Sequence, residues 1–278
     1  MSNAEDIVAP AVGLQAPDCE ALHLGPDWPA IEVVHEDADL LAVNKPAGYL
    51  VARDRWDAAR ANLMDALHEA LRVKKPWCVR RGYTYLANVH RLDLNTSGLL
   101  LLAKNRPILV QLARLFLRRE VAKTYLALTR GVPREAEFRI ELGIEADPTR
   151  LGRSRVSRKH GKPAATRVQV VERFQDYALV RAFPETGRLH QIRVHLAAAG
   201  FPLVADPDYG DGHPLLLSRL KQGYRPKPEG ERPLLGRPAL HAEALDFTHP
   251  VTGQPVHIAA PWPRDFTVAL KYLRLFGA

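Results

Sequence analysis

Polar side chains able to do acid–base or nucleophilic chemistry crowd into residues 90 to 97, directly before an apolar run at 99 to 103. The cluster surrounds one carboxylate with hydrogen-bonding neighbours: His90, Arg91, Asp93, Asn95, Thr96 and Ser97. The run is apolar enough for a buried strand, although its periodicity also fits a buried helix. Gly98 lets the backbone turn before the run starts. A carboxylate at the mouth of a buried strand indicates a reactive site at Asp93.

A second polar cluster lies at residues 186 to 196. Thr186 is a suitable N-cap, and the apolar spacing that follows predicts a helix ending at Gly200. His190 and His195 are one residue off the i, i+4 spacing that puts two metal ligands on one helical face. We therefore expect no metal site here, and predict core or hydrogen-bonding roles for both histidines.

Hydrophobic patterning predicts the elements that position these clusters. On period two, Lys123 and Tyr125 share one face of the strand at 121–129, and Leu126 and Leu128 share the other. Helices are expected at 62–73, 107–119 and 265–276. Strands are expected at 31–37 and 40–44 as a hairpin, at 121–129, at 168–174 and 177–183 as a second pair, and at 240–247 and 256–259.

Composition bounds the class of protein. The chain has 278 residues, 46% hydrophobic and 25% charged, which is ordinary globular composition for one domain or two. It has no apolar run long enough to span a membrane and no secretory signal, so a cytoplasmic protein is expected. Cys19 and Cys78 are too few for a disulfide framework and form no C-x-x-C pair, so structural zinc is not expected.

The net charge of +8 favours a polyanionic partner, and its distribution points to one segment. Residues 150–167 are the most basic part of the chain, and contact with a phosphate backbone would relieve their mutual repulsion. A second basic stretch, at 74–85, interleaves Trp77, Tyr83 and Tyr85, a pattern that suits single-stranded nucleic acid but also fits a solvated connector. Residues 206–238 are predicted to form a surface loop.

The central cluster resembles the signature of the RluA-type RNA pseudouridine synthases, and other motifs match in the same order between residues 33 and 262. The matching segments are Asn-Lys-Pro-Ala-Gly (44–48), His-Arg-Leu-Asp (90–93), Thr-Ser-Gly-Leu-Leu (96–100), Lys-Thr-Tyr (123–125), Gly-Arg-Leu-His-Gln-Ile-Arg-Val-His (187–195), Asp-Tyr-Gly (208–210), Leu-His-Ala (240–242) and Phe-Thr-His-Pro (247–250). An ordered series of this length is far more specific than any one tetrapeptide.

The resemblance implies an α+β fold, with a mixed, mostly antiparallel central sheet, flanking helices and a central RNA-binding cleft. Residues 31–278 would form the catalytic domain, after a poorly ordered tail at 1–30. An S4-like module is not expected, because fewer than forty residues precede the first matched strand. The implied activity is isomerisation of uridine to pseudouridine in a ribosomal or transfer RNA loop, by a monomer without metal or organic cofactor.

The resemblance also implies roles for residues. The nucleophilic aspartate falls on Asp93, the active-site tyrosine on Tyr125, the buried arginine partner on Arg193 and the base-displacing arginine on Arg91. Among the remaining candidates, the predicted RNA contacts are Arg155, Arg158, Lys159 and Lys162, and the predicted supporting residues are His90, Thr96 and Ile192.

The residues fit this chemistry. A carboxylate can act as a nucleophile or as a base that removes a sugar proton, and the sequence leaves both routes open. A non-catalytic RNA-binding or chaperone protein would explain the charge but not Asp93. A hydrolase built on Ser97 is set aside, because residues 95–98 do not form a G-x-S-x-G elbow.

Overall fold

The computed structural model describes residues 21–54, 57 and 59–277. The strands of its large sheet are β1 (Glu32–Glu36), β2 (Leu40–Lys45), β3 (Ala87–Asn88), β4 (Ser97–Ala103), β5 (Ala122–Arg130), β6 (Glu137–Glu141), β9 (Ala165–Arg173), β10 (Tyr177–Pro184), β11 (Leu240–Thr248) and β12 (Pro255–Ala259). A separate pair is formed by β7 (Ile144–Ala146) and β8 (Ser154–Val156). The helices are α1 (Leu63–Arg72), α2 (Pro76–Arg80), α3 (Arg106–Arg118), α4 (Gln191–Ala198), α5 (Leu217–Leu220) and α6 (Arg264–Phe276).

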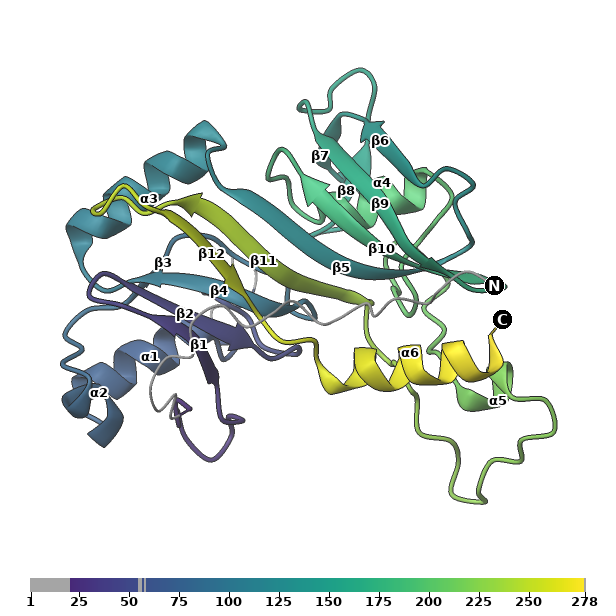
Figure 1. Ribbon diagram of the computed structural model, residues 1–278, viewed down its shortest axis with the longest axis horizontal. Helices are drawn as coiled ribbons and strands as arrows, with labels where there is room; N and C mark the ends of the chain where they lie inside the picture. Colours follow the sequence, from purple (N-terminus) through teal and green to yellow (C-terminus); the bar gives the residue numbers. More distant parts are fainter. Residues whose placement is uncertain (1–20, 55–56, 58, 278) are drawn as a thin grey trace.

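The large sheet runs through the whole molecule in the order β1-β2-β4-β11-β5-β10-β9-β6, with β12 added to β11 and β3 to β4. The β4–β11 pairing is parallel and the other pairings between named strands are antiparallel. Figure 1 shows α1 and α2 near β1 and β2 at one end, and α4 among β6 to β10 at the other. The expected mixed, mostly antiparallel α+β fold is confirmed.

The apolar run after the polar cluster is a strand, which resolves the ambiguity in its periodicity. All seven residues of β4 are buried, because the strand lies between β2 and β11 and is covered on both faces. A strand in this position needs no polar alternation.

The two faces of β5 pack against different layers, as period two predicts. Leu126 and Leu128 pack in the cluster that contains Phe266 of α6, whereas Ala127 and Tyr125 pack in a cluster with Ile192 of α4. The central sheet therefore separates an α6 face from the face that carries Tyr125.

Gly98 holds β4 and β11 at close approach. Its φ is +110°, and a Cβ built on it would lie 2.7 Å from the backbone nitrogen of Ala242. Because the clash is with backbone, it cannot be relieved by a rotamer change. We expect Gly98→Ala to lower the free energy of unfolding by about 2–4 kcal/mol, measured by urea denaturation.

Gly253→Ala is the matched control, since Gly253 also has positive φ (+68°) but nothing within 4 Å of the added carbon. Equal losses of stability in the two variants would show that the close strand approach does not matter.

Several predicted elements match the structure. The N-cap of α1 is Asn62, whose side chain accepts from the backbone N–H of Asp65. The predicted hairpin forms as β1 and β2, and the predicted strand pair forms as β9 and β10. The closing helix forms as α6 and lies on the sheet through Phe266 and Leu270.

Three predictions need correction. The helix of the second polar cluster begins at Gln191, not after Thr186, because the Thr186 hydroxyl donates to the Gln191 side chain instead of capping the helix. Residues 21–30 do not belong to a tail, since Leu22 pairs with Ile31 and is buried; residues 1–20 lie outside the described part of the chain. The alternative of an aromatic stacking surface at 74–85 is wrong for Trp77 and Tyr83, which are buried in the core, whereas Tyr85 is half-buried.

Candidate active site

The structure brings Asp93 and Arg193 together from distant parts of the sequence. Asp93 begins a turn, called here the Asp93 loop (residues 93–97), which leads into β4; Arg193 lies on α4. Nη1 of Arg193 is 3.6 Å from Oδ2 of Asp93. The Arg193 side chain is 7% exposed and that of Asp93 is 25% exposed, so the carboxylate reaches solvent while its cationic neighbour does not.

Arg193 is held in place by two further carboxylates. Nε and Nη2 donate to the two oxygens of the fully buried Asp206, both at 2.7 Å, and Nη2 also donates to Asp208 at 2.7 Å. Burial opposes the charge of Arg193, but the hydrogen bonds and charge of Asp206, with Asp93 and Asp208, raise its pKa. The guanidinium therefore stays charged, and Nη1 is left to face Asp93.

His190 approaches the same oxygen of Asp93. Its Nε2 lies 3.9 Å from Oδ2, and its Nδ1 lies 2.8 Å from the Tyr209 hydroxyl. That hydroxyl accepts from the backbone N–H of Ser154, so its own proton is available for Nδ1, and the ring proton of a neutral His190 falls on Nε2. Burial lowers the pKa of His190, which keeps the ring neutral. His190 has a left-handed backbone (φ 55°), unusual for a side-chain-bearing residue and often found at functional sites.

These contacts leave the Asp93 carboxylate without a short side-chain partner. Arg193 and His190 both lie near Oδ2, at 3.6 and 3.9 Å. With 25% of its side chain exposed, the carboxylate is available to a substrate.

Tyr125 supplies a neutral aromatic ring on the same face of the sheet. Burial and the negative charge of Asp93 raise the pKa of its phenol. The ring packs against core clusters on either side of the site. Tyr125 therefore offers a flat apolar surface and a protonated hydroxyl rather than a phenolate.

The three predicted supporting residues have distinct contacts, of which only that of Thr96 is with Asp93 itself. His90 stacks on Phe116 with ring centroids 5.1 Å apart, and its Nε2 accepts from the backbone N–H of Leu101. Burial, with the nearby charge of Lys123, lowers the pKa of His90 to about 3. The backbone N–H of Thr96 donates to the Asp93 carbonyl, and Ile192 is buried beneath α4.

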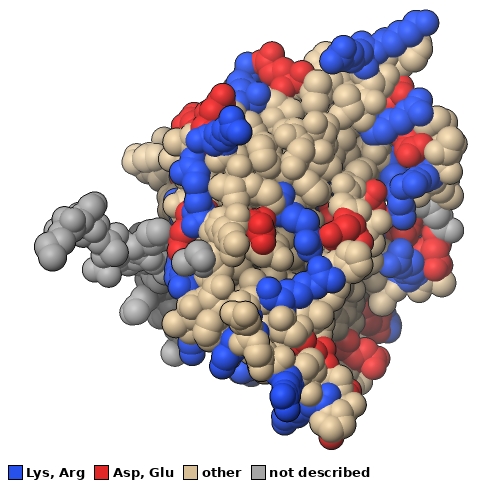
Figure 2. Space-filling model, turned by 90° about the vertical axis from the view of Figure 1, so that its right-hand side faces the viewer, with Lys and Arg blue, Asp and Glu red and all other residues tan. Residues whose placement is uncertain are grey.

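The predicted RNA contacts divide into paired and unpaired cations. Arg155 forms an ion pair with Glu145 at 2.9 Å. Over the chain segments that the structure describes, the charged groups of the other four are exposed and form no hydrogen bond or ion pair: Arg91, Arg158, Lys159 and Lys162. Figure 2 shows Lys and Arg side chains distributed over one end of the molecule with acidic side chains between them, so this face carries no continuous basic patch.

Arg158 also lines a polar cavity of about 450 Å³ with Arg119 and Arg139. Thr186, at its edge, accepts a hydrogen bond through its carbonyl from Lys123, two residues before Tyr125 along β5. The cavity therefore adjoins the strand that carries Tyr125.

One group of side chains has the composition of a metal site, namely Asp37, Asp39 and His249. Hydrogen bonds to the backbone and between the side chains explain why these three residues lie close together. Nδ1 of His249 accepts from two backbone N–H groups of the following turn, so the ring proton on Nε2 faces Asp37 at 3.3 Å. Asp37 also accepts from the backbone of Asp39 and Leu40. The group ties two turns together.

No role was predicted for Asp206, Asp208 or Tyr209, and only a general hydrogen-bonding role for His190. The available signal was the Asp-Pro-Asp-Tyr-Gly sequence at 206–210, where two carboxylates and a phenol stand close together at the start of the predicted surface loop. The predicted hydrogen-bonding role of His195 is confirmed, since its Nε2 bonds the Leu142 carbonyl and its Nδ1 bonds Thr166. None of the described helices is long and apolar enough to cross a membrane.

Comparison with known proteins gives one consistent family. Residues 39–198 match the RNA pseudouridylate synthase family. The chain is 38% identical to ribosomal large subunit pseudouridine synthase D of Neisseria meningitidis serogroup B over 93% of its length, and spans 65% of that relative. It is 36% identical to ribosomal large subunit pseudouridine synthase C of Escherichia coli K12, covering 87% of this chain and 70% of the relative.

A solved structure agrees. The human RNA pseudouridylate synthase domain containing 4 protein superimposes with a TM-score of 0.66 at 26% identity, over 87% of this chain and 92% of that one. The family match covers more than half of the chain and includes Asp93, Tyr125 and Arg193. The chain belongs to the RNA pseudouridine synthase family, in the RluA-type group that its motifs resemble.

Proposed function

We propose that this protein converts uridine to pseudouridine in structured RNA, with Asp93 as the reacting carboxylate. The observation that carries the proposal is the arrangement of this carboxylate. The carboxylate lies 3.6 Å from a buried, charged Arg193, and its own 25% exposure leaves it accessible to a substrate. Family membership supplies the reaction class, and the names of the relatives make large-subunit ribosomal RNA the first substrate to test.

The reaction is an isomerisation, so the composition of the nucleoside is unchanged: the proton that C5 loses is balanced by one that N1 gains from solvent. The bond between N1 and the sugar breaks, the uracil turns while it stays bound, and C5 joins the sugar carbon as the C5 proton leaves. A carboxylate oxygen of Asp93 either attacks C1′, in which case its bond to C1′ breaks again when C5 joins the sugar, or removes the proton from C2′ and later returns it. On both routes Arg193 stabilises the carboxylate, and Tyr125 holds the detached base against its ring.

The target uridine must leave its stack before Asp93 can reach the sugar. Base extrusion costs a few kcal/mol, and least for bases that are already unpaired, so RNA loops are the expected targets. Arg91 is exposed two residues before Asp93, and we propose that it occupies the space that the extruded base leaves. Action as a monomer in the cytoplasm stays a prediction.

Release of tritium tests the proposal. RNA labelled with tritium at C5 of uridine loses the label to water when C5 bonds to the sugar. We expect release from ribosomal RNA without added metal or nucleotide, in proportion to pseudouridine formed. Binding of the same RNA without any release would instead identify a non-catalytic RNA-binding protein.

The unpaired cations of the basic segment predict a selective effect on binding. Replacing Arg158, Lys159 and Lys162 together with Gln removes exposed charges that have no partner among the residues that the structure describes. We expect KM for RNA to rise about tenfold or more at moderate salt with little change in kcat, because phosphate contacts act before the chemical step. The slope of log KM against log salt should become shallower by about 0.7–0.9 for each phosphate that the variant no longer neutralises.

Arg155→Gln is the control for that measurement, because Arg155 is engaged with Glu145. Its effect on KM should be small. A triple variant with unchanged KM and an unchanged salt slope would exclude this segment from the RNA interface.

A further inference from the structure

Arg237 contacts the Asp93 loop from the α6 face of the sheet, opposite the face that carries Tyr125. Its Nη1 donates to the backbone carbonyl of Asn95 at 3.0 Å, and its Nη2 donates to the Ser97 hydroxyl at 3.0 Å. Nη1 also donates to the carbonyl of Leu240, at the start of β11, at 3.0 Å. One guanidinium thus joins two residues of the loop to the neighbouring strand.

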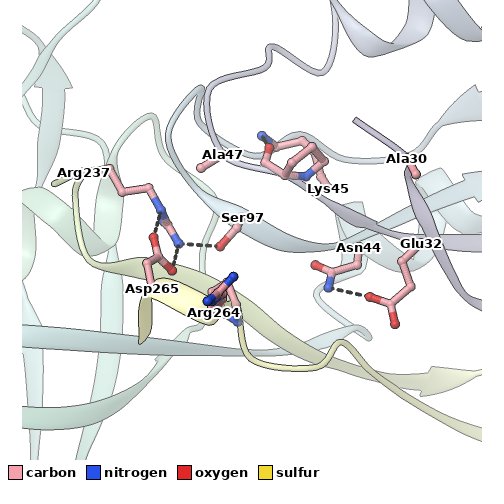
Figure 3. A pocket seen from close by; sticks show the side chains of 11 residues that line it. Ala30, Glu32, Asn44, Lys45, Ala47, Ser97, Arg237, Arg264 and Asp265 are labelled. Atoms are coloured by element: carbon pink, nitrogen blue, oxygen red, sulfur yellow. Dashed lines mark hydrogen bonds and ion pairs between the residues drawn. The ribbon is translucent and has the colours of Figure 1, made fainter. Parts of the chain in front are cut away.

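Arg237 is itself fixed by the first turn of α6. Asp265 accepts from Nε at 2.7 Å and from Nη2 at 3.1 Å, in a two-point pairing that sets the plane of the guanidinium. Figure 3 shows this pair, and the contact of Arg237 with Ser97, on the wall of a cavity of about 380 Å³. The Arg237 side chain is 14% exposed.

Lys45 contacts the same loop at Leu94, one residue before the Asn95 carbonyl that Arg237 binds. It is fully buried at the end of β2, and its Nζ donates to the carbonyls of Leu94, Pro46 and Tyr49 at 3.3, 2.8 and 2.8 Å. Burial lowers the pKa of Lys45 to about 7, which the charge of Asp93 opposes, and three accepting carbonyls match the three N–H bonds of an ammonium. The two residues that follow Asp93 therefore each have a carbonyl held by a basic side chain.

The Asp93 carboxylate has no comparable support of its own within the described part of the chain. Its neighbours Arg193 and His190 lie 3.6 and 3.9 Å away, beyond hydrogen-bond length, and the group is partly exposed. Its position must therefore come mainly from the backbone of the loop, which Arg237 and Lys45 hold.

We infer that Arg237 is a positioning residue for the reaction, acting through Asn95 and Ser97 to keep Asp93 in register with Arg193 and Tyr125. The inference rests on the proposed function. A lysine at this position would keep the charge but could not make the planar, two-sided contact with the loop and Asp265. Displacement of a reacting group by about 1 Å costs on the order of 100-fold in rate.

Arg237→Lys and Arg264→Lys form the test pair. Arg264 lines the same cavity but is exposed, and across the described residues its guanidinium forms no hydrogen bond or ion pair. With tritium-labelled RNA, we expect Arg237→Lys to lower kcat about 10- to 100-fold while KM and the Kd for RNA stay within about twofold. Arg264→Lys should behave as the wild type. Asp265→Asn, which loosens Arg237 without removing it, should lower kcat in the same direction.

Thermal unfolding of each variant, with kinetics well below its Tm, separates positioning from folding. A lower Tm with unchanged kcat in Arg237→Lys would reduce Arg237 to a structural residue and overturn the inference. A higher KM with unchanged kcat would make it an RNA contact and overturn it as well. If Arg237→Lys does not fold, Asp265→Asn decides by the same criteria. Absence of tritium release by the wild type would overturn the proposed function, and with it this inference. If the wild type does release tritium, the results for the variants concern the role of Arg237 alone.

Discussion

Asp93→Asn is expected to abolish tritium release, with kcat at least about 1,000-fold below that of the wild type. The amide has nearly the shape of the carboxylate, but it can neither attack C1′ nor accept a sugar proton. Because Asp93 is partly exposed and is contacted only at 3.6 Å and beyond by Arg193 and His190, the change should leave the fold intact. The Kd for RNA should change little, so the loss falls on the chemical step.

Asp176→Asn controls for loss of a carboxylate, since Asp176 is exposed in the turn between β9 and β10. It should keep full activity. Turnover by Asp93→Asn close to that of the control would remove Asp93 from the mechanism on either chemical route.

Arg193→Met should be the most destabilising of the substitutions considered. It removes the cationic partner of the fully buried Asp206, whose carboxylate then keeps only the backbone N–H groups of Asp208 and Tyr209 as donors. Breaking a buried pair by removing one partner costs about 3–5 kcal/mol, and we expect a loss of that order in the free energy of unfolding. Urea denaturation measures it directly.

Two further variants test whether the loss of stability comes from the buried Arg193–Asp206 pair. Arg139 forms a similar two-point pair with Glu185, but on the exposed surface, so Arg139→Met should change stability little. Adding Asp206→Asn to Arg193→Met should recover part of the lost stability, because the uncompensated buried charge is then gone. If Arg193→Met were as stable as Arg139→Met, the buried pair would not have the structural role described here.

Elements whose signals are local could be predicted from the sequence. The polar residues before β4, the Asn62 cap of α1 and the alternation along β5 each report a preference that the folded chain keeps. The order of the motifs was enough to identify the family and to name Asp93, Tyr125 and Arg193.

The features that could not be predicted from the sequence depend on contacts between distant segments of the chain. Nothing near Arg237 in the sequence indicates that it contacts Asn95, and nothing near Asp206 indicates a buried partner in α4. The start of α4 was misplaced because Thr186 prefers the Gln191 side chain, a competition that capping rules do not anticipate. Trp77 and Tyr83 looked like a basic, aromatic surface because their burial depends on residues around β1 and α1.

The proposed role of Asp93 can be checked in the structure of the protein bound to an RNA stem–loop that contains its target uridine. We expect an extruded uridine whose C1′ or C2′ lies about 3–3.5 Å from a carboxylate oxygen of Asp93, with Arg193 still beside the carboxylate and the uracil against the Tyr125 ring. A target uridine that stays stacked in the RNA, or an extruded one whose sugar lies away from Asp93, would contradict it.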